Sequence, residues 1–562
     1  MGSPTRPARG AALLLVLALV TGACTRDQPE SREDVLDRDV TEPSGERVDG
    51  GSVAVGHEHE PTVLNPLLVE GNLRSTVMAT RPVLSGAYMI TPDLRYVPDL
   101  LAGEAEPAGG VGEEPFTVTW RIRDEAVWSD GTPVSADDLA FTYETMVDEE
   151  WDIETLLRSG FEEITETEVM DAKTWRATFT EVYAPYRTMF ETVLPAHVLE
   201  GQDFNEVWSD GIVDPTSGEA IGNGPFLFGE WERGRLLTLV RNPEFWGEPA
   251  DLEEITFRYD EDVASLLELL GSGDAHMYVP QQPLRVILAR LRAMDDLQVQ
   301  VDAGPVWEHL AFNFSNEMLA KRYVREAIIR AIDREELVDE LLRDVNPDAT
   351  VLHDPLHMEN HDAHAPVFGR YTYDPEAAIQ LLEDNSCTRE DAQGVFTCDG
   401  QELEFRYLST TGNEQRRQLF EMVRTSLADI GIALVDDLSP PAEALRERLP
   451  EGDFDIVSFA WVGGPDPHRT SSVFVCDGAL NYTGYCNEGV STLLAAGRGI
   501  LDREDRAAAY NEASALLADD VALVPLFQLP EALALSDHLG GVRVNPTQWG
   551  PTWNASEWFL TE

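Results

Sequence analysis

Strand-like and helix-like patterns alternate along most of this chain, and no stretch repeats another. Alternating apolar positions mark strands at residues 50–56, 116–123 and 236–241, and helical spacing marks residues 263–270, 324–342, 375–383, 414–430 and 503–517. Alternation of this kind predicts an α/β fold. Because 562 residues are more than one compact core usually holds, we expect two or three lobes.

The chain is strongly acidic. Aspartate and glutamate number 102 against 41 lysines and arginines, the formal net charge is −61, and Lys173 and Lys321 are the only lysines. Such a surface repels phosphate backbones, so nucleic acid is not an expected partner. A high-salt habitat would account for the acid excess. A GC-rich genome that encodes arginine in place of lysine, together with an acidic proteome, would account for it equally well.

The N-terminus predicts export. Arg6 and Arg9 precede an apolar run at residues 11–20, and Thr21-Gly22-Ala23 then leads to Cys24. A basic flank, a short apolar run and small residues are typical of a secretory signal, here residues 1–23. The stretch before Cys24 resembles a bacterial lipobox, so we expect a lipid on Cys24 that anchors the protein to the outer face of the cell membrane. The alternative is an ordinary secretory signal with a chance cysteine. Residues 24–48 are charged and predict a flexible tether.

Four further cysteines remain, an even number that suits disulfides in an oxidising compartment. Three pairings are possible, and we favour the two local ones, Cys387–Cys398 and Cys476–Cys486. Zinc is the rival explanation, but the close Cys-x-x-Cys spacing of structural zinc sites is missing.

Four stretches, in order, carry a resemblance to a known family. They are residues 120–123 with Trp128-Ser129-Asp130-Gly131-Thr132-Pro133; Gly222-Asn223-Gly224-Pro225-Phe226 with 241–246; 310–313 with 324–334; and Trp461 with Asp466-Pro467 and 481–487. Together they resemble the oligopeptide- and dipeptide-binding branch of the bacterial extracellular solute-binding proteins, family 5, which serve ATP-binding-cassette (ABC) importers. The order and spacing hold from about residue 50 to the C-terminus.

The resemblance implies a bilobed periplasmic-binding-protein-like α/β fold (type II, cluster C) with an extra inserted lobe. Lobe I would hold residues 49–90, 217–305 and 526–562, lobe II residues 91–216, and lobe III residues 306–525. The ligand would lie between lobes I and III, which close over it by a hinge motion.

The function implied is capture of a small solute, with a peptide as the expected ligand, and its delivery to ABC permease subunits in the membrane. The protein would be a monomer without catalytic activity or cofactor. No Gly-x-Ser-x-Gly elbow, Walker loop or dinucleotide fingerprint occurs in a suitable context. Three alternatives remain: uptake of a metal chelate of the nickel type, an extracellular hydrolase on a similar body, and a sensor that presents ligand to a signalling partner.

By the same resemblance, a few residues are expected to line the cleft. They are Glu70, Gln281, Trp461, Gly464, Asp466, Asn481 and Tyr485. One departure matters, because peptide binders of the family carry an aspartate three residues after this tryptophan, where it pairs with the α-amino group. Gly464 stands at that place here. Without a carboxylate there, a buried ammonium would be costly, so either another acid takes the role or the ligand is not an ordinary peptide.

Four histidines gather within twelve residues: His353, His357, His361 and His364. Histidine and the carboxylates among them suit transition metals, which makes a metal site the weaker candidate reading. We favour an exposed polar loop of lobe III, because Pro355 and Pro366 oppose the regular helix that would align the rings.

Overall fold

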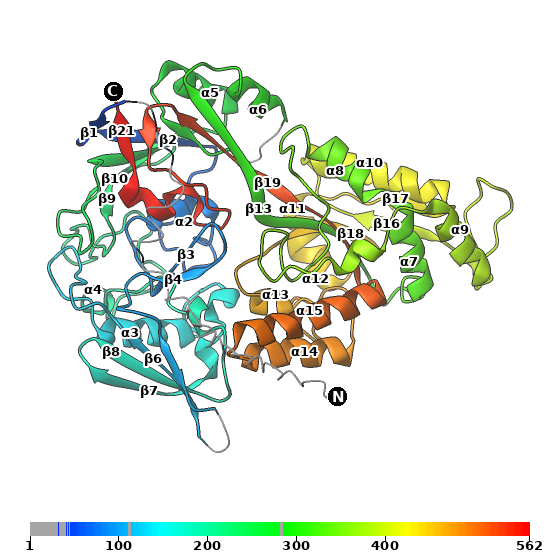
Figure 1. Cartoon of the computed structure of the whole chain (residues 1–562), viewed down its shortest axis with the longest axis horizontal. Helices are drawn as coiled ribbons and strands as arrows, with labels where there is room; N and C mark the ends of the chain where they lie inside the picture. The colour runs from blue at the N-terminus through cyan, green and yellow to red at the C-terminus, as the bar shows by residue number, and fades with distance from the viewer. Residues whose placement is uncertain (1–31, 33–40, 42, 44, 111–113, 282–284) are drawn as a thin grey trace, which may run out of the picture.

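A computed structural model of the chain describes residues 32, 41, 43, 45–110, 114–281 and 285–562 (Figure 1). The predicted signal, residues 1–23, and Cys24 lie outside the described residues. Within them, no helix is both long enough and apolar enough to cross a membrane. We keep the names lobe I, II and III for the residue ranges given above.

One mixed sheet of ten strands runs through lobes I and III (Figure 1). In spatial order its strands are β17 (Ala433–Asp436), β16 (Glu404–Leu408), β18 (Ile456–Val462), β13 (Leu297–Phe312), β19 (Leu523–Ser536), β12 (Met277–Tyr278), β2 (Ser52–His57), β11 (Glu254–Tyr259), β10 (Leu236–Arg241) and β9 (Phe226–Glu232). The centre of lobe I is parallel, since β2 pairs in parallel with β11 and β12. A strand flanked in this way is covered on both faces, which explains why Val53 to His57 are all buried.

Two long strands, β13 and β19, cross from lobe I to lobe III. They pair antiparallel from Leu297↔Ser536 in lobe I to Ala311↔Leu523 in lobe III. The register shifts between Ala303 and Trp307, so the ladder is interrupted near the middle of the crossing. Interrupted pairing lets a strand bend, so both crossing strands can bend at this point.

Lobe II has a sheet of its own, ordered β5 (Glu106–Ala108), β6 (Phe116–Arg121), β8 (Thr174–Phe179) and β7 (Ile164–Asp171), with α3 (Ala136–Val147) packed on it. Trp120 of β6 and Trp175 of β8 are fully buried and pack together, with ring centroids 5.4 Å apart. Smaller elements of lobes I and II are α2 (Arg74–Thr80), β3 (Tyr88–Ile90), β4 (Tyr96–Pro98), α4 (Ala196–Leu199), α5 (Val263–Ser272) and α6 (Arg285–Leu291).

Lobe III is rich in helices, of which the main ones are α7 (Arg322–Ala331), α8 (Arg334–Leu341), α9 (Pro375–Asp384), α10 (Glu414–Asp429), α13 (His468–Ser471), α14 (Glu488–Gly499) and α15 (Arg503–Asp520). The single helix predicted over 324–342 is wrong, because the chain leaves helical geometry at Ile332 and restarts at Arg334. Asp333 causes the restart: its side chain accepts the Glu336 N–H at 3.1 Å and caps α8.

The hydrophobic core divides the molecule into two bodies. One continuous cluster joins residues of lobe I, such as Val53 and Leu237, to residues of lobe II, such as Trp120 and Trp175. A second cluster fills lobe III around β13, β16, α7 and α10. Lobes I and II therefore form one packed body and lobe III the other. This is the bilobed α/β arrangement that the sequence predicts.

The folded body begins before residue 49. β1 (Arg47–Val48) pairs with β21 (Phe559–Thr561) through Arg47↔Thr561 and Val48↔Leu560, near the C-terminus (Figure 1). The prediction of a flexible tether up to residue 48 is therefore wrong at its end. Arg47 and Val48 are too short a stretch to show the alternation of a strand. The strand that they pair with lies at the far end of the chain, so no local pattern predicts it.

Candidate functional site

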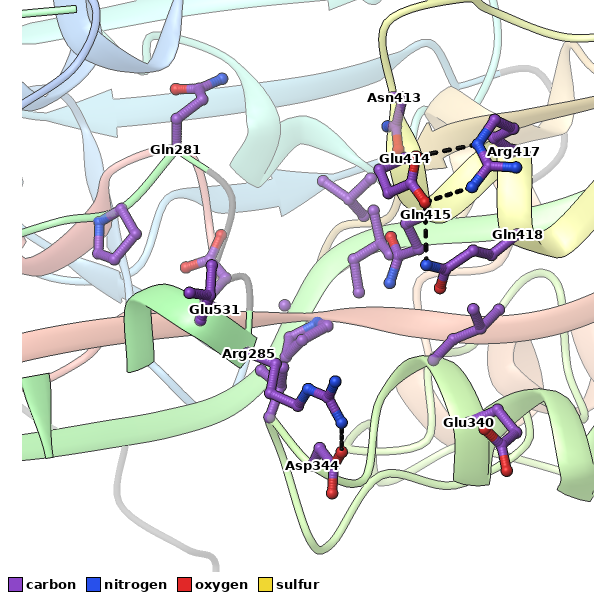
Figure 2. Close-up of a pocket in the computed structure, with 18 of the residues that line it drawn as sticks. Gln281, Arg285, Glu340, Asp344, Asn413, Glu414, Gln415, Arg417, Gln418 and Glu531 are labelled. Carbon is purple, nitrogen blue, oxygen red and sulfur yellow. Dashed lines mark hydrogen bonds and ion pairs between the residues drawn. The ribbon is translucent and has the colours of Figure 1, made fainter. Parts of the chain in front are cut away.

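Two cavities lie between the two bodies. The first, which we call the Trp461 cavity, has a volume of about 400 Å³ and is lined from all three lobes, including Arg81, Tyr96, Glu191, Trp461, Asp466, Arg469 and Trp549. The second, the Gln281 cavity, measures about 730 Å³, and both apolar and charged or polar side chains line it (Figure 2). Its labelled residues are Gln281, Arg285, Glu340, Asp344, Asn413, Glu414, Gln415, Arg417, Gln418 and Glu531.

Trp461 stands at the end of β18, where it pairs with Trp307 of the crossing strand β13. Its ring stacks on Tyr482, with centroids 6.4 Å apart and planes 17° from parallel. The indole Nε1 is buried and has no hydrogen-bond partner among the described residues. The side chain thus offers the cavity a flat apolar face.

Asp466 also lines this cavity, but its carboxylate is already engaged. It accepts the His468 N–H at 3.0 Å, and Arg506 lies 3.3 Å from its other oxygen. Burial opposes ionisation of Asp466, yet the hydrogen bond from His468 and the charge of Arg506 outweigh it and hold its pKa well below the usual range. Asp466 is therefore a structural anion rather than a free partner for an incoming ammonium.

Gly464 lines the same cavity and faces open space. A Cβ built there meets no atom within 4 Å. No neighbouring side chain therefore fills this part of the cavity wall.

An ion pair crosses the cavity between the two bodies. Arg469 of lobe III donates from Nη2 to Glu191 Oε1 of lobe II at 2.7 Å. Nearby, lobe III also contacts lobe II where the Ala184 N–H donates to the Arg498 carbonyl at 2.8 Å and Arg498 pairs with Glu163. These contacts join lobe II directly to lobe III.

Arg81 brings a second cation to the cavity from the end of α2. It is only 7% exposed, donates from Nη2 to Asp99 at 2.6 Å, and its guanidinium lies 3.9 Å from the centroid of the Trp549 ring. Sequence reasoning missed Arg81, Glu191, Arg469 and Trp549. No local pattern singles them out, because the residues that meet here are far apart in the chain; Arg469 and Glu191 are separated by 278 positions.

The other predicted site residues lie elsewhere. Gln281 lines the Gln281 cavity, and its backbone N–H donates to Glu58 at 2.9 Å. Glu70 is exposed and lines neither cavity. Asn481 donates to the carbonyls of Val475 and Tyr485, and Tyr485 donates its hydroxyl to Asp520 at 2.7 Å. Asn481 therefore holds its own loop, Tyr485 attaches that loop to α15, and both lie outside the two cavity linings.

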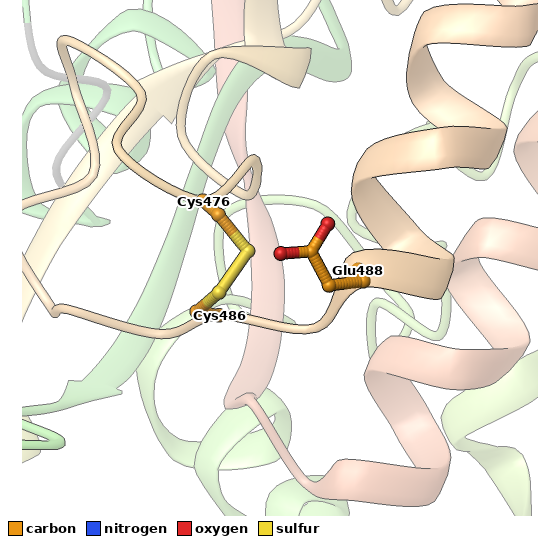
Figure 3. Close-up of side chains that lie close together, drawn as sticks. All are labelled: Cys476, Cys486 and Glu488. Atoms are coloured by element: carbon orange, nitrogen blue, oxygen red, sulfur yellow. A yellow bond between two sulfur atoms is a disulfide. The ribbon is translucent and has the colours of Figure 1, made fainter.

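Both disulfides have the local pairing, Cys387–Cys398 and Cys476–Cys486. Glu488 lies beside the second (Figure 3), and this is the only group of three possible metal-ligating side chains in the described part of the chain. The two sulfurs are bonded to each other, so neither is a thiolate that a metal would bind.

The histidine segment is not the exposed loop that was expected. His357 is 2% exposed, and its Nδ1 lies 3.0 Å from the side-chain oxygen of Asn511 on α15. Asp354 is fully buried and accepts from Ser514 of the same helix at 2.6 Å. The segment is anchored to α15 by its polar side chains, which sequence polarity alone had suggested would face water.

Two packed bodies, two strands that cross between them and cavities where the bodies meet are the architecture of a protein that binds a solute between its lobes. The profile of the bacterial extracellular solute-binding proteins, family 5 (middle region), matches residues 96–480. This chain belongs to that family. It is a solute-binding protein of the kind that serves ABC importers, as the sequence predicts.

Among similar proteins, the oligopeptide-binding protein OppA of Mycobacterium tuberculosis is 26% identical over 499 residues, covering 87% of this chain and 82% of OppA. The oligopeptide-binding protein AppA of Bacillus subtilis is 22% identical over 98% of both chains. Among solved structures, the periplasmic EDTA-binding protein EppA superposes with a TM-score of 0.81 at 25% identity, covering 92% of this chain and 98% of EppA.

Proposed function

We propose that this protein captures peptides, or a related small solute, in the Trp461 cavity and delivers them to a membrane permease. The observation that carries the proposal is the cavity itself, which all three lobes line and which the Arg469–Glu191 ion pair between lobes III and II spans. Similarity to two oligopeptide-binding proteins over most of the chain supports a peptide. No catalytic step is proposed, since capture and release need only the hinge.

Native mass spectrometry of the protein lacking residues 1–24, purified without metal affinity and in adequate salt, tests this proposal. We expect a spread of bound masses that fragment as peptides. The protein should also be monomeric in the same spectra. A single discrete adduct that contains a metal would contradict the peptide and identify a metal chelate as the ligand.

A metal chelate is the second candidate, and two observations favour it. Gly464 leaves the cavity without a free acid for a peptide's α-ammonium, and the EDTA-binding protein EppA has a similar fold over nearly its whole length. Chelators of this type carry several carboxylates and no such ammonium. Growth on a metal supplied only as its EDTA complex separates this candidate from peptide uptake. The comparison is between a deletion strain and the same strain with the gene restored.

We also propose that a lipid on Cys24 holds the protein at the outer face of the membrane. The basic flank, the apolar run and the small residues before Cys24 support this. Replacing Cys24 with serine should move the protein from the membrane fraction to the soluble one. Equal membrane retention of both forms would argue against the anchor.

A further inference from the structure

A loop that a disulfide closes forms part of the wall of the Trp461 cavity. The Cys476–Cys486 bond joins residues ten positions apart, and Leu480, which lies between them, lines the cavity. Tyr482 of the same loop is the residue whose ring stacks on Trp461. We call residues 476–486 the disulfide loop. It supplies one side chain to the cavity and holds another against the tryptophan in the cavity wall.

The disulfide is the one covalent link across the neck of this loop. Hydrogen bonds cross the same neck, because the Asn481 side chain donates to the carbonyls of Val475 and Tyr485 at 2.9 and 2.6 Å. The Cys476 N–H donates to the Ser491 hydroxyl of α14 at 3.0 Å and attaches one end of the loop. Water can replace a hydrogen bond at little net cost, whereas a disulfide removes open conformations altogether. The order of the loop therefore depends mainly on the disulfide.

The two disulfides of the protein differ in their exposure to solvent. Cys486 is exposed and Cys476 is half-buried (Figure 3). Cys387 and Cys398, in contrast, are 3% and 0% exposed and belong to the core of lobe III. Thiol–disulfide exchange requires a thiolate to reach a sulfur atom. A small dithiol can therefore reach the Cys476–Cys486 bond in the folded protein, whereas the Cys387–Cys398 bond is protected until the core of lobe III unfolds.

We propose that the disulfide loop sets the affinity of the Trp461 cavity: Leu480 contacts the solute, Tyr482 positions the Trp461 ring, and the exposed disulfide keeps both in place. This rests on the proposed function and assigns the loop a part in it. Affinity then depends on a dithiol reductant. The dithiol gives up two electrons and two protons, the S–S bond breaks, two thiols form, and the dithiol becomes a cyclic disulfide. A solute must then order the freed loop when it binds, which lowers its affinity.

The test is calorimetric titration of oxidised and mildly reduced protein with trileucine, trialanine and the iron(III) complex of EDTA. Dithiothreitol opens the disulfide, the freed thiols are alkylated, and the reagents are removed before titration. Mass spectrometry of the alkylated protein should show Cys476 and Cys486 modified first. The probe that binds the oxidised protein best should bind the reduced protein about tenfold more weakly. Cys476→Ser/Cys486→Ser should bind it as weakly without any reductant, and dithiothreitol should have no further effect on that variant.

Variants connect the effect to the two side chains. Tyr482→Ala should weaken the same probe about threefold or more, and Tyr482→Phe, which keeps the ring, should bind like the wild type. Tyr373→Ala is the matched control, because it removes an exposed tyrosine of lobe III that lines neither cavity. Leu480→Ala should weaken the probe by about the same factor, and Leu480→Met should recover most of the loss. Circular dichroism confirms that each variant is folded.

Hydrogen–deuterium exchange separates failure of this inference from failure of the proposed function, because it needs no solute. Reduction should raise exchange in the disulfide loop and leave exchange in lobe I unchanged. Unchanged exchange in the loop would overturn the inference, and so would equal affinities of the oxidised and reduced proteins for a probe that binds. Wild-type affinity in both Tyr482→Ala and Leu480→Ala would overturn it as well. Protein that binds none of the three probes, while its loop still loosens on reduction, counts against the proposed function and not against the role of the disulfide.

Discussion

Arg74 and Glu531 are joined by two parallel hydrogen bonds, 2.5 and 2.9 Å long, which attach α2 to the crossing strand β19. Glu531 is buried and lies in the lining of the Gln281 cavity (Figure 2), next to the irregular middle of the crossing. Burial raises the pKa of Glu531, and the charge of Arg74 only partly offsets this. Arg74 therefore stabilises the buried carboxylate of Glu531 at the place where the two bodies meet.

Replacing Arg74 with methionine should destabilise the protein by about 3 kcal/mol, because it leaves Glu531 buried without a partner. The double variant Arg74→Met/Glu531→Gln should recover much of that loss. Arg285→Met is the control, since its pair with Asp344 is largely exposed and should be worth less than about 1 kcal/mol. Urea unfolding measures all three. An Arg74→Met loss no larger than the control's would contradict this account.

Gly304 should tolerate no larger side chain. A Cβ there would lie 2.7 Å from Glu531 Cγ and 2.7 Å from the Leu529 carbonyl oxygen, which is backbone and cannot rotate away. Gly304→Ala should therefore cost about 1–3 kcal/mol through overpacking. Gly464→Ala, where the Cβ meets nothing within 4 Å, should be neutral within about 0.5 kcal/mol. Thermal unfolding of the two variants side by side checks the contrast.

Gly464→Asp should change which end of a peptide the cavity prefers. The new carboxylate would enter open space in the lining and offer an ammonium the free acid that the cavity now lacks. We expect a peptide with a free α-ammonium to gain about tenfold in affinity relative to its N-acetyl form. Titration of both peptides into both proteins measures the ratio. If the ratio stays at its wild-type value, the site does not read this end of the ligand.

Acid should destabilise the protein through His309. This residue is 2% exposed beneath Trp307 and Phe459, and burial, aided by the charge of Arg416, lowers its pKa to about 3. The folded state therefore resists a proton that the unfolded chain accepts near pH 6.5. The stabilisation is complete above that pH and is lost as the pH falls towards 3, by up to about 1.4 kcal/mol per pH unit.

Urea unfolding between about pH 7 and about pH 4.5 measures this loss. His309→Gln should make the decline shallower, even though it lowers stability at neutral pH through lost packing. His538→Gln, at an exposed position, is the control. Parallel declines for His309→Gln and the wild type would exclude His309 as the source.

Local features of the fold were predictable, whereas distant pairings were not. The helix predicted at 414–430 is α10, because Asn413 caps it and its apolar spacing lies within one segment. β13 and β19 are 16 and 14 residues long, yet no alternating pattern marks them as two crossing strands. The two strands pair with each other across a long stretch of sequence. The surroundings of both strand faces also change where each strand passes from one body to the other, which breaks the alternation.

The same division holds for the site. Trp461, Gly464 and Asp466 all line the cavity, and they sit on one short segment. The family resemblance could point to them because it matches that segment. Asn481 and Tyr485 belong to an equally recognisable segment, but their polar atoms bond the loop itself and Asp520 of α15. A motif that shapes a turn and a motif that contacts a ligand look alike in sequence. The cations Arg81 and Arg469 could be found only when folding brought their lobes together.

The ion pairs between lobes II and III make the distance between the two bodies depend on salt. Both bodies are acidic and repel each other, and salt reduces the range of this repulsion to about 10 Å at 0.1 M. Arg469–Glu191 and Arg498–Glu163 act at contact and are screened far less. We therefore expect high salt to favour the closed arrangement of the two bodies and low salt the open one. The salinity outside the cell would then adjust the affinity for each captured solute.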